Sequence, residues 1–445
     1  MFNKIIEKLK DKKIAILGFG REGKSTYNFI NRHLDNQDIT ILDKNDIDVD
    51  CKKVIGENYL DNLNDYDIII KSPGISLKDI DINPIKDKIT SQLELLLEVN
   101  SNNMIGITGT KGKSTTRSLT YEVLKDQLED VFLLGNIVKP VLDEVEKYTD
   151  KTILVIEMSS HQLEFVRRSP HVAAILNLYQ DHLDHDGTVE HYHQNKLNIF
   201  KYQTDTDYYI YSDDNPDLNK KINDYPYRGI RYTVRFDNEN LNGNRTRLLN
   251  KDVIINDKII YHDNNRLLLG DHNLKNIMFV LTIAKIMNLD LERAKKVIDN
   301  FKGLKYRMEY IGNANGIDFY NDTIATIPDA TINAVNSIPN IETLILGGLD
   351  RGIDYEPFIN YLKESKLKTI ICMPTTGIKI GKALEDTNKK ILYANTLEEA
   401  YKEAVNNTEI GKACILSPAA ASYEFFKNFE EKGKAFEEIV KKDIN

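Results

Sequence analysis

Short apolar runs alternate along the chain with longer stretches in which apolar residues recur at helical spacing. The stretches at 24–34 and 117–127 predict helices, the second with Leu119, Val123 and Leu124 on one face. The runs predict buried parallel strands at 14–17, 39–42, 67–71, 104–108, 152–156, 172–177 and 344–346. This alternation predicts an α/β protein built around parallel sheets.

The first two predicted strands flank a glycine-rich segment, Gly18-Phe-Gly20-Arg-Glu-Gly23, and the second ends at Asp43. Glycines let the backbone approach a phosphate at a helix N-terminus, and an acidic residue about 20 residues on can bind a ribose. The pattern predicts a Rossmann-like nucleotide-binding domain. It leaves three possibilities open: a nicotinamide dehydrogenase, another nucleotide-binding protein, or glycines that only form tight turns.

The strand at 104–108 runs into Gly109-Thr-Lys-Gly-Lys-Ser-Thr115, which precedes a predicted helix. A strand, a Gly-Lys-Ser loop and a helix in this order are typical of a phosphate-binding P-loop. The spacing matches a shorter variant of the usual motif, because Gly106 lies six residues before Gly112. We expect the loop amides to wrap phosphates, Lys113 to reach the terminal ones and the Ser114 hydroxyl to bind Mg²⁺.

Acidic and histidine residues follow the next two strands. Glu157 stands at the end of one, and Asp181 and His182 follow the other. Ligands of parallel sheets bind beyond the carboxyl ends of the strands, so Glu157 is well placed to bind a second hard cation. Six of the nine histidines lie between His161 and His193, but their spacing matches no zinc motif.

Composition narrows the class of protein further. The 445 residues predict two or three domains, and 68 acidic against 59 basic residues give a net charge of −9. This net negative charge argues against nucleic-acid or anionic-membrane partners. Any anionic ligand must therefore be bound by a local site, such as a glycine-rich loop at a helix N-terminus. Three widely spaced cysteines suit a reducing compartment, and no apolar run reaches the ~18 residues of a membrane span. We expect a soluble, cytoplasmic monomer.

Five segments taken together resemble one family, the Mur ligases, over essentially the whole chain. They are the P-loop, Gly135-Asn136-Ile137, Glu157-Met-Ser-Ser160, Asp181-His182-Leu-Asp184 and His272-Asn273-Leu-Lys-Asn276. The C-terminal Leu416-Ser-Pro-Ala-Ala-Ala-Ser422 and Asn428-Phe429-Glu430 are similar to the branch that adds D-glutamate.

The resemblance implies three domains and one reaction. The domains would be a UDP-sugar-binding Rossmann-like domain at 1–98, a central ATP-binding P-loop domain at 99–303 and a glutamate-binding Rossmann-like domain at 304–445. The reaction would be ATP-dependent amide formation between UDP-N-acetylmuramoyl-L-alanine and glutamate, through an acyl phosphate, in peptidoglycan precursor synthesis. The small-molecule partners would be these two substrates, ATP and two Mg²⁺ ions.

The resemblance also implies site residues. ATP would contact Gly109, Thr110, Lys111, Gly112, Lys113, Ser114, Thr115, Asn273, Asn276, Arg307 and Asp322. The UDP-sugar side would contact Gly20, Arg21, Glu22, Asp43, Lys44, Ser72, Pro73, Gly74, Asn136 and Ser159. Glutamate would contact Arg351, Ser422 and Phe429. Metal ligands would be Ser114, Glu157, His182 and Lys196, the last as a carbamate. Lys113, His182 and Lys196 would serve catalysis, with His182 a candidate base.

One departure from the family pattern bears on the amino acid. The family has a lysine where this chain has Ile324, within Asp322-Thr-Ile-Ala-Thr326. We expect D-glutamate, with L-glutamate as the nearest alternative. Three competing functions stand further away: a folylpolyglutamate-type ligase, which has no N-terminal glycine-rich domain, a non-catalytic nucleotide-binding regulator and, more remotely, a dehydrogenase.

Overall fold

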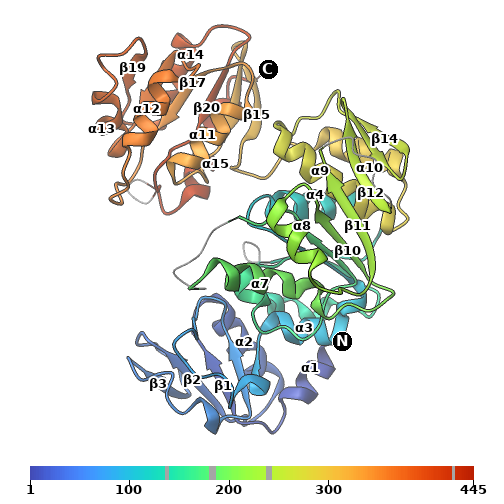
Figure 1. The fold of residues 1–445 in the computed structure, drawn as a ribbon. Coiled ribbons are helices and arrows are strands. Elements are labelled where there is room, and N and C mark those ends of the chain that lie inside the picture. The colour runs from blue at the N-terminus through green and yellow to red at the C-terminus, as the bar shows by residue number, and fades with distance from the viewer. Residues whose placement is uncertain (136–139, 180–186, 237–242, 423–425, 445) are drawn as a thin grey trace. The chain divides into compact units, whose positions relative to one another are not determined.

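The computed structural model describes residues 1–135, 140–179, 187–236, 243–422 and 426–444 (Figure 1). The chain forms two compact units, one of residues 1–264 and 275–298, the other of residues 265–274 and 299–445. The first unit contains two β-sheets and the second contains a third. Strands alternate with helices in all three, which confirms the predicted α/β class.

The N-terminal sheet has five parallel strands in the order β3-β2-β1-β4-β5. Successive strands are added on one side of β1 up to β3 and then on its other side from β4. The loops that follow β1 and β4 therefore lie next to each other at the carboxyl edge of the sheet, as in Rossmann-like folds. The strands are β1 (Ile14–Leu17), β2 (Ile39–Asp43), β3 (Lys52–Ile55), β4 (Ile68–Lys71) and β5 (Ile89–Thr90). The helices are α1 (Phe2–Leu9), α2 (Arg21–His33) and α3 (Gln92–Asn100).

The central sheet has nine strands in the order β14-β13-β12-β11-β10-β9-β6-β8-β7. It is parallel from β7 to β12, and the predicted strands at 104–108, 152–156 and 172–177 form β6, β8 and β9. The pairs β12–β13 and β13–β14 are antiparallel, and the other strands of this sheet were not predicted. The strands are β6 (Met104–Thr108), β7 (Val131–Leu134), β8 (Ile153–Glu157), β9 (Val172–Ile175), β10 (Tyr208–Ser212), β11 (Ile230–Arg235), β12 (Asn244–Leu249), β13 (Asp252–Ile255) and β14 (Lys258–His262). The helices that follow β6 along the chain are α4 (Lys113–Lys125), α5 (Ser160–Leu163), α7 (Val189–Lys201), α8 (Pro216–Asn223), α9 (Asp271–Ile286) and α10 (Leu291–Asn300).

The third sheet has six strands in the order β15-β16-β20-β17-β18-β19, parallel except for the pair β15 and β16. Strands β18 and β19 are added on one side of β17, and β20 returns to its other side, so the order of the strands reverses between β17 and β20. The strands are β15 (Glu309–Ala314), β16 (Ile317–Asn321), β17 (Ile341–Leu346), β18 (Thr369–Cys372), β19 (Lys390–Tyr393) and β20 (Ala413–Leu416). The helices are α11 (Pro328–Ser337), α12 (Glu356–Glu364), α13 (Thr376–Lys382), α14 (Leu397–Asn407) and α15 (Phe429–Lys441).

The two helices predicted after the glycine loops begin earlier than their apolar patterns indicate. α2 starts at Arg21 instead of 24, and α4 starts at Lys113 instead of 117. Each follows a glycine N-cap, Gly20 or Gly112. The prediction was late because an apolar stripe marks only the turns packed on the sheet, whereas the first turn adjoins the glycine loop.

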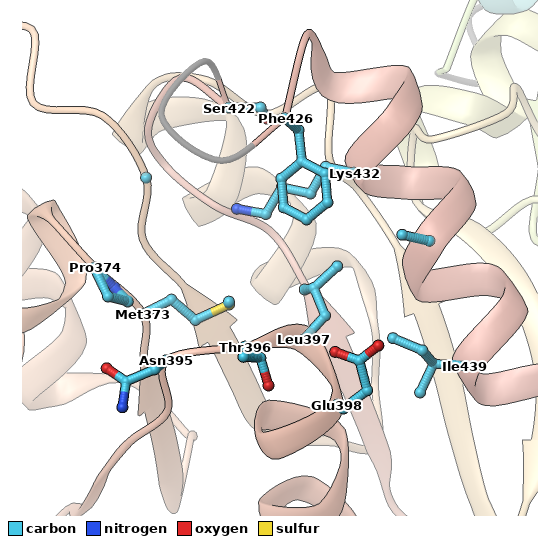
Figure 2. Close-up of a pocket in the computed structure, with 12 residues that line it drawn as sticks. Met373, Pro374, Asn395, Thr396, Leu397, Glu398, Ser422, Phe426, Lys432 and Ile439 are labelled. Carbon is cyan, nitrogen blue, oxygen red and sulfur yellow. The ribbon is translucent and has the colours of Figure 1, made fainter.

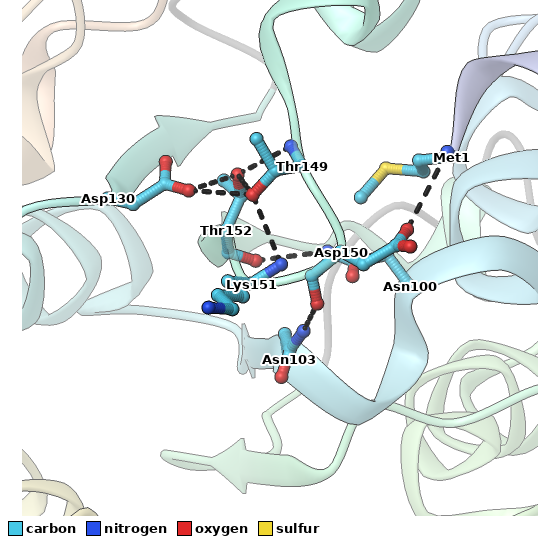
Figure 3. Close-up of polar contacts among 8 residues, drawn as sticks. All are labelled: Met1, Asn100, Asn103, Asp130, Thr149, Asp150, Lys151 and Thr152. Atoms are coloured by element: carbon cyan, nitrogen blue, oxygen red, sulfur yellow. Dashed lines mark hydrogen bonds and ion pairs between the residues drawn. The ribbon is translucent and has the colours of Figure 1, made fainter.

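A polar network holds the start of β8 (Figure 3). Thr149 and Thr152 both donate hydroxyl hydrogen bonds to the Asp130 carboxylate, at 2.9 and 2.7 Å. The Asn100 side-chain amide donates to the Thr152 carbonyl oxygen at 3.3 Å, and that of Asn103 donates to the Asp150 carbonyl oxygen at 2.6 Å. These contacts position the strand that carries Glu157 at its other end.

Two further expectations concern membrane spans and cysteines. Among the described residues, no helix combines the length and the apolar character needed to cross a bilayer. The three cysteines are free thiols, with Cys372 and Cys414 buried and Cys51 half-buried.

One buried carboxyl group in α3 bears on stability. Glu94 is 1% exposed, and its carboxylate accepts a hydrogen bond from the Arg167 backbone N–H at 2.8 Å. Its other oxygen, Oε1, has no hydrogen-bond partner in the described part of the chain. Burial raises the pKa of Glu94 to about 7. Between about pH 4.5 and 7 the native state therefore holds a proton that the unfolded chain releases, so stability falls as pH rises through this window.

We expect Glu94→Gln to be more stable than the wild type at pH 8, by up to about 3 kcal/mol, because it removes a buried charge and keeps an acceptor for Arg167. The gain should vanish below about pH 4.5, where the unfolded carboxyl is also protonated. Urea unfolding at several pH values measures it, with Glu7→Gln, exposed on α1, as the control. A difference that does not change with pH would contradict the assignment.

Candidate nucleotide and substrate site

The P-loop joins β6 to α4 through two glycines in backbone conformations that other residues rarely adopt. Gly109 has φ of 149° and Gly112 has φ of 87°. A Cβ added at Gly112 would lie 2.6 Å from the Asn276 side-chain oxygen, so a larger residue would displace that amide as well as strain the backbone. Asn276, predicted on the nucleotide side, therefore lies against the loop.

Asn177, just beyond β9, shapes the loop from the other side. Its side-chain oxygen accepts hydrogen bonds from the N–H groups of Thr110 and Lys111, at 3.1 and 2.9 Å. Its amide donates to the Lys111 carbonyl oxygen at 3.0 Å, and the Tyr192 hydroxyl donates to Thr110 Oγ1 at 3.2 Å. Sequence reasoning missed Asn177 as a site residue, although its place at a strand end beside the P-loop strand was a usable signal.

The loop lysine lies over the loop itself. The Lys113 ammonium donates to the carbonyl oxygens of Gly109 and Thr110, both at 2.9 Å. A cation therefore stands at the N-terminus of α4, where the unpaired N–H groups of a helix also favour an anion. This is the arrangement that the motif predicts for binding phosphate.

Two oxygen-bearing side chains meet beside the loop. The Ser114 hydroxyl donates to the Glu157 carboxylate at 2.8 Å, because β6 and β8 are parallel neighbours that end at the same edge. Glu157 is 6% exposed, and the Arg117 guanidinium lies 3.6 Å from the same oxygen. Burial lowers the pKa of Arg117, and Glu157 opposes that shift. A hydroxyl and a carboxylate are hard ligands that suit Mg²⁺.

The predicted metal set is only partly covered by the structure. Within the described ranges, no cluster of three or more His, Cys, Asp or Glu side chains could hold a metal ion. His182 and Asn136 lie outside the described residues. Lys196 lies on α7, is 2% exposed and has its ammonium 4.7 Å from the centre of the Tyr192 ring. It is therefore a buried residue, unlike an ordinary solvated helix lysine.

The glycine-rich loop of the first sheet is held by its own predicted binding residues. The Asp43 carboxylate accepts hydrogen bonds from the N–H groups of Phe19 at 2.7 Å and Asn45 at 2.8 Å. The Ser72 hydroxyl donates to the Gly18 carbonyl oxygen at 2.9 Å. A Cβ added at Gly23 would overlap that same oxygen. Asp43 and Ser72 therefore shape the loop between β1 and α2.

Polar contacts connect this loop to the central sheet within the first unit. The Gln162 amide donates to the Glu22 carboxylate at 3.1 Å, and Gln162 forms a capping box with Ser159 at the start of α5. Burial raises the pKa of Glu22. Lys71 pairs with Glu164 at 3.1 Å, and both side chains are at most 10% exposed. The other predicted residues of this loop region are Gly20, Arg21, Lys44 and Gly74, which are exposed, and Pro73, which is half-buried.

The second unit contains the remaining predicted residues. Asp322 is 4% exposed and accepts hydrogen bonds from the Ser417 hydroxyl at 2.7 Å and the Met308 N–H at 3.1 Å. Burial raises its pKa to about 7. Arg307 and Arg351 are exposed. The Phe429 ring packs edge-on against Tyr306, and the Asn273 amide donates to the Leu269 carbonyl oxygen at 2.7 Å. Ser422 is buried and, together with Lys432 of α15, lines a cavity of about 260 Å³ (Figure 2).

A phosphate loop at the carboxyl edge of a largely parallel sheet, joined to a Rossmann-like sheet, defines the class as an α/β nucleotide-binding protein of the P-loop type. Known proteins narrow this class. Residues 107–284 match the Mur ligase middle domain, and residues 306–420 match the Mur ligase glutamate ligase domain. The chain belongs to the Mur ligase family.

Two curated relatives match almost end to end. The UDP-N-acetylmuramoylalanine–D-glutamate ligase of Acetivibrio thermocellus is 33% identical, over 98% of both chains. The enzyme of the same name from Clostridioides difficile is 33% identical, over 97% of this chain and 99% of its own.

Solved structures agree with the fold. The UDP-N-acetylmuramate–alanine ligase of Thermotoga maritima superposes with a TM-score of 0.58 at 17% identity, covering 97% of this chain and 99% of its own. A UDP-N-acetylmuramoyl-L-alanyl-D-glutamate–2,6-diaminopimelate ligase gives 0.56 at 18% identity, covering 94% and 89%. The three-domain Mur ligase architecture predicted from the sequence is therefore confirmed.

We expect Gly112→Ala to weaken ATP binding by at least about tenfold, because the new Cβ both strains the left-handed backbone and displaces Asn276. Titration calorimetry with ATP measures the affinity. The matched control is Gly411→Ala in the second unit, which has φ of 83° but open space around the added Cβ. It should cost about 1 kcal/mol of stability and leave ATP affinity unchanged. Equal ATP affinity in the two variants would contradict the steric argument.

Proposed function

We propose that this protein is a cytoplasmic ATP-dependent ligase that joins D-glutamate to UDP-N-acetylmuramoyl-L-alanine in peptidoglycan precursor synthesis. The observation that carries the proposal is the match at 33% identity, over nearly the whole chain, to ligases named for this reaction. The P-loop with its adjoining Ser114 and Glu157 supports the ATP dependence. Mur ligases in general depend on ATP and magnesium.

The chemistry explains why such a ligase needs ATP. A carboxylate does not react with an amine at neutral pH, because oxide is a poor leaving group. Transfer of the γ-phosphoryl group to the muramoyl-alanine carboxylate converts it to an acyl phosphate. The glutamate amine then attacks the acyl carbon, and inorganic phosphate leaves. Phosphoryl transfer of this kind is accelerated mainly by positioning and by neutralising the charge on the phosphate oxygens.

In this proposal, residues of the first unit bind the ATP phosphates and the metal ions. The amides of the 109–115 loop and the Lys113 ammonium would hold the ATP phosphates, with Asn276 beside the loop. Ser114, Glu157, His182 and a carbamylated Lys196 would hold two Mg²⁺ ions, which neutralise phosphate charge. Burial of Lys196 supports its modification, because a buried group is held in place, and a carbamate supplies oxygen ligands where an ammonium would repel metal.

The substrates would bind at carboxyl edges of the sheets. We assign the UDP-sugar to the 18–23 loop, Asp43, Lys44 and the 72–74 loop, with Asn136 and Ser159 on the central side. Asn273, Arg307 and Asp322 are assigned to ATP, and Arg351, Ser422 and Phe429 to glutamate. His182 is the candidate for accepting the amine proton. The domain boundaries at 98 and 303, and a monomeric state, belong to the same proposal.

We expect phosphate release from ATP that requires both UDP-N-acetylmuramoyl-L-alanine and D-glutamate. Because Ile324 stands where the family has a lysine, the same assay is run with L-glutamate and without any amino acid. A preference for L-glutamate would contradict the stereochemical assignment. Release that does not depend on the amino acid would contradict the ligase.

We expect Lys196→Ala to lose at least about 100-fold in kcat and to regain part of it when acetate or formate is added, because a short carboxylate can replace the carbamate oxygens. The lysine at 201, exposed at the end of the same helix, provides the control Lys201→Ala, which should keep wild-type activity and show no acetate effect. Full activity in Lys196→Ala would show that the reaction needs no carbamate.

A further inference from the structure

The segment that follows β10 lies two strands away from the strand that carries the P-loop. In the central sheet β10 pairs with β9 and β9 pairs with β6, all in parallel, so the three strands end at the same edge. Residues 212–215, called the 212–215 turn below, connect β10 to α8 (Figure 1). None of the site residues assigned above lies in this turn.

Asn215 of the turn supports the P-loop from the β9 side. Its side chain is buried, and its amide donates a hydrogen bond to the Leu178 carbonyl oxygen at 3.2 Å. Its side-chain oxygen accepts from the Leu218 N–H at 3.0 Å and thereby caps α8, so both ends of the amide are engaged. Leu178 follows Asn177, which accepts hydrogen bonds from two N–H groups of the 109–115 loop. Asn215 therefore holds the segment that in turn holds the loop.

Asp214 of the turn is bound to helix α9. The Lys275 ammonium and the Ser212 hydroxyl both donate to its Oδ1, the hydroxyl at 2.6 Å, and the Phe236 N–H donates to its Oδ2 at 3.1 Å. Burial alone would raise the pKa of Asp214, but hydrogen bonds from Lys275 and Ser212 hold this pKa below its ordinary value. The carboxylate is therefore charged at neutral pH and pairs with the ammonium.

This ion pair supports the P-loop from the α9 side. Lys275 immediately precedes Asn276, and a helix fixes the backbones of adjacent residues together. The Asn276 side-chain oxygen lies against the loop, since a Cβ added at Gly112 would be 2.6 Å from it. Both residues that adjoin the loop, Asn177 and Asn276, are thus next in the chain to a residue held by the 212–215 turn.

We propose that the 212–215 turn positions the 109–115 loop for ATP, with Asp214 and Asn215 as the positioning residues. Asp214 acts through α9, and Asn215 acts through the segment after β9. The inference rests on the proposed function, because it assumes that the loop binds the ATP phosphates. Phosphate binding needs the loop amides in fixed places, and contacts that are formed beforehand lower the entropic cost of binding.

Two variants of nearly unchanged shape test the proposal. Asp214→Asn removes the charge that pairs with Lys275, whereas Asn215→Asp keeps the oxygen that caps α8 but loses the donor to the Leu178 carbonyl oxygen. In each variant we expect KM for ATP to rise about 5- to 30-fold. Both kcat at saturating ATP and KM for UDP-N-acetylmuramoyl-L-alanine should stay within about twofold of the wild type, because only ATP binding is affected. Titration calorimetry with ATP should show the loss of affinity without turnover.

A direct measurement of the loop separates positioning from general stability. Hydrogen exchange of the 109–115 amides should be faster in both variants, by at least about fivefold, because the loop loses a constraint. The matched control is Asp217→Asn, which removes one negative charge from an exposed position on α8. It should leave both KM for ATP and the exchange of the loop unchanged.

Variants of the lysine decide the case if Asp214→Asn does not fold. Lys275→Met should raise KM for ATP as Asp214→Asn does, and Lys275→Arg should recover most of the lost affinity because it retains the charge and the donors. The exposed lysine at 285 of the same helix provides the control Lys285→Met, which should bind ATP as the wild type does.

Three results would overturn the proposal. One is wild-type KM for ATP and wild-type loop exchange in both turn variants. Another is tighter ATP binding in Asp214→Asn, which would show that Lys275 acts on ATP directly. The third is a parallel loss toward both substrates and in kcat, which would assign the turn a general structural role. A wild type that does not bind ATP contradicts instead the proposed function.

Discussion

The contact between the Ser114 hydroxyl and the Glu157 carboxylate depends on almost every feature of the first unit. It joins the first turn of α4 to the last residue of β8, two segments 43 residues apart in the chain. The distance of 2.8 Å requires that β6 and β8 be adjacent and parallel, so that both end at one edge. It also requires a sharp turn at Gly112, and the start of β8 is held by hydrogen bonds from the 149–152 segment. The Rossmann-like sheet adjoins the same region through Glu22 and Gln162.

Both glycine-rich loops of this unit follow one physical rule. Each places glycine where a Cβ would collide with a neighbouring oxygen, that of Asn276 at Gly112 and that of Gly18 at Gly23. Each loop is then held by a polar side chain at the carboxyl end of a neighbouring strand, Asn177 just after β9 in one and Asp43 at the end of β2 in the other. These contacts fix the backbone of each loop before any ligand binds, which lowers the entropic cost of binding. An acidic protein can bind phosphates in this way without a basic surface.

The second unit combines the same sheet geometry with buried charges. Asp322 is surrounded by hydrogen-bond donors and has a raised pKa, whereas Lys432 has a carbonyl partner and faces a cavity. A carboxyl can be neutralised by a proton within the fold, at a moderate cost. A buried ammonium is stabilised by polar partners in the same way, here by the Gly347 carbonyl oxygen.

The sequence by itself determined the local elements and the nature of the chemistry. Apolar runs located β1, β2, β6 and β9, and the order of glycine, lysine and serine at 109–115 identified the phosphate loop, because these features depend on residues close together in the chain. The starts of α2 and α4 and the antiparallel strands β13 and β14 were missed, since glycine caps and short strands near the edge of a sheet carry weak periodic signals. Only the tertiary structure decided that Asn177 shapes the P-loop, that Lys196 is buried and that Lys432 faces a cavity with Ser422. Burial and hydrogen-bond partners depend on contacts between segments that are far apart in the sequence. A local sequence pattern therefore does not predict them.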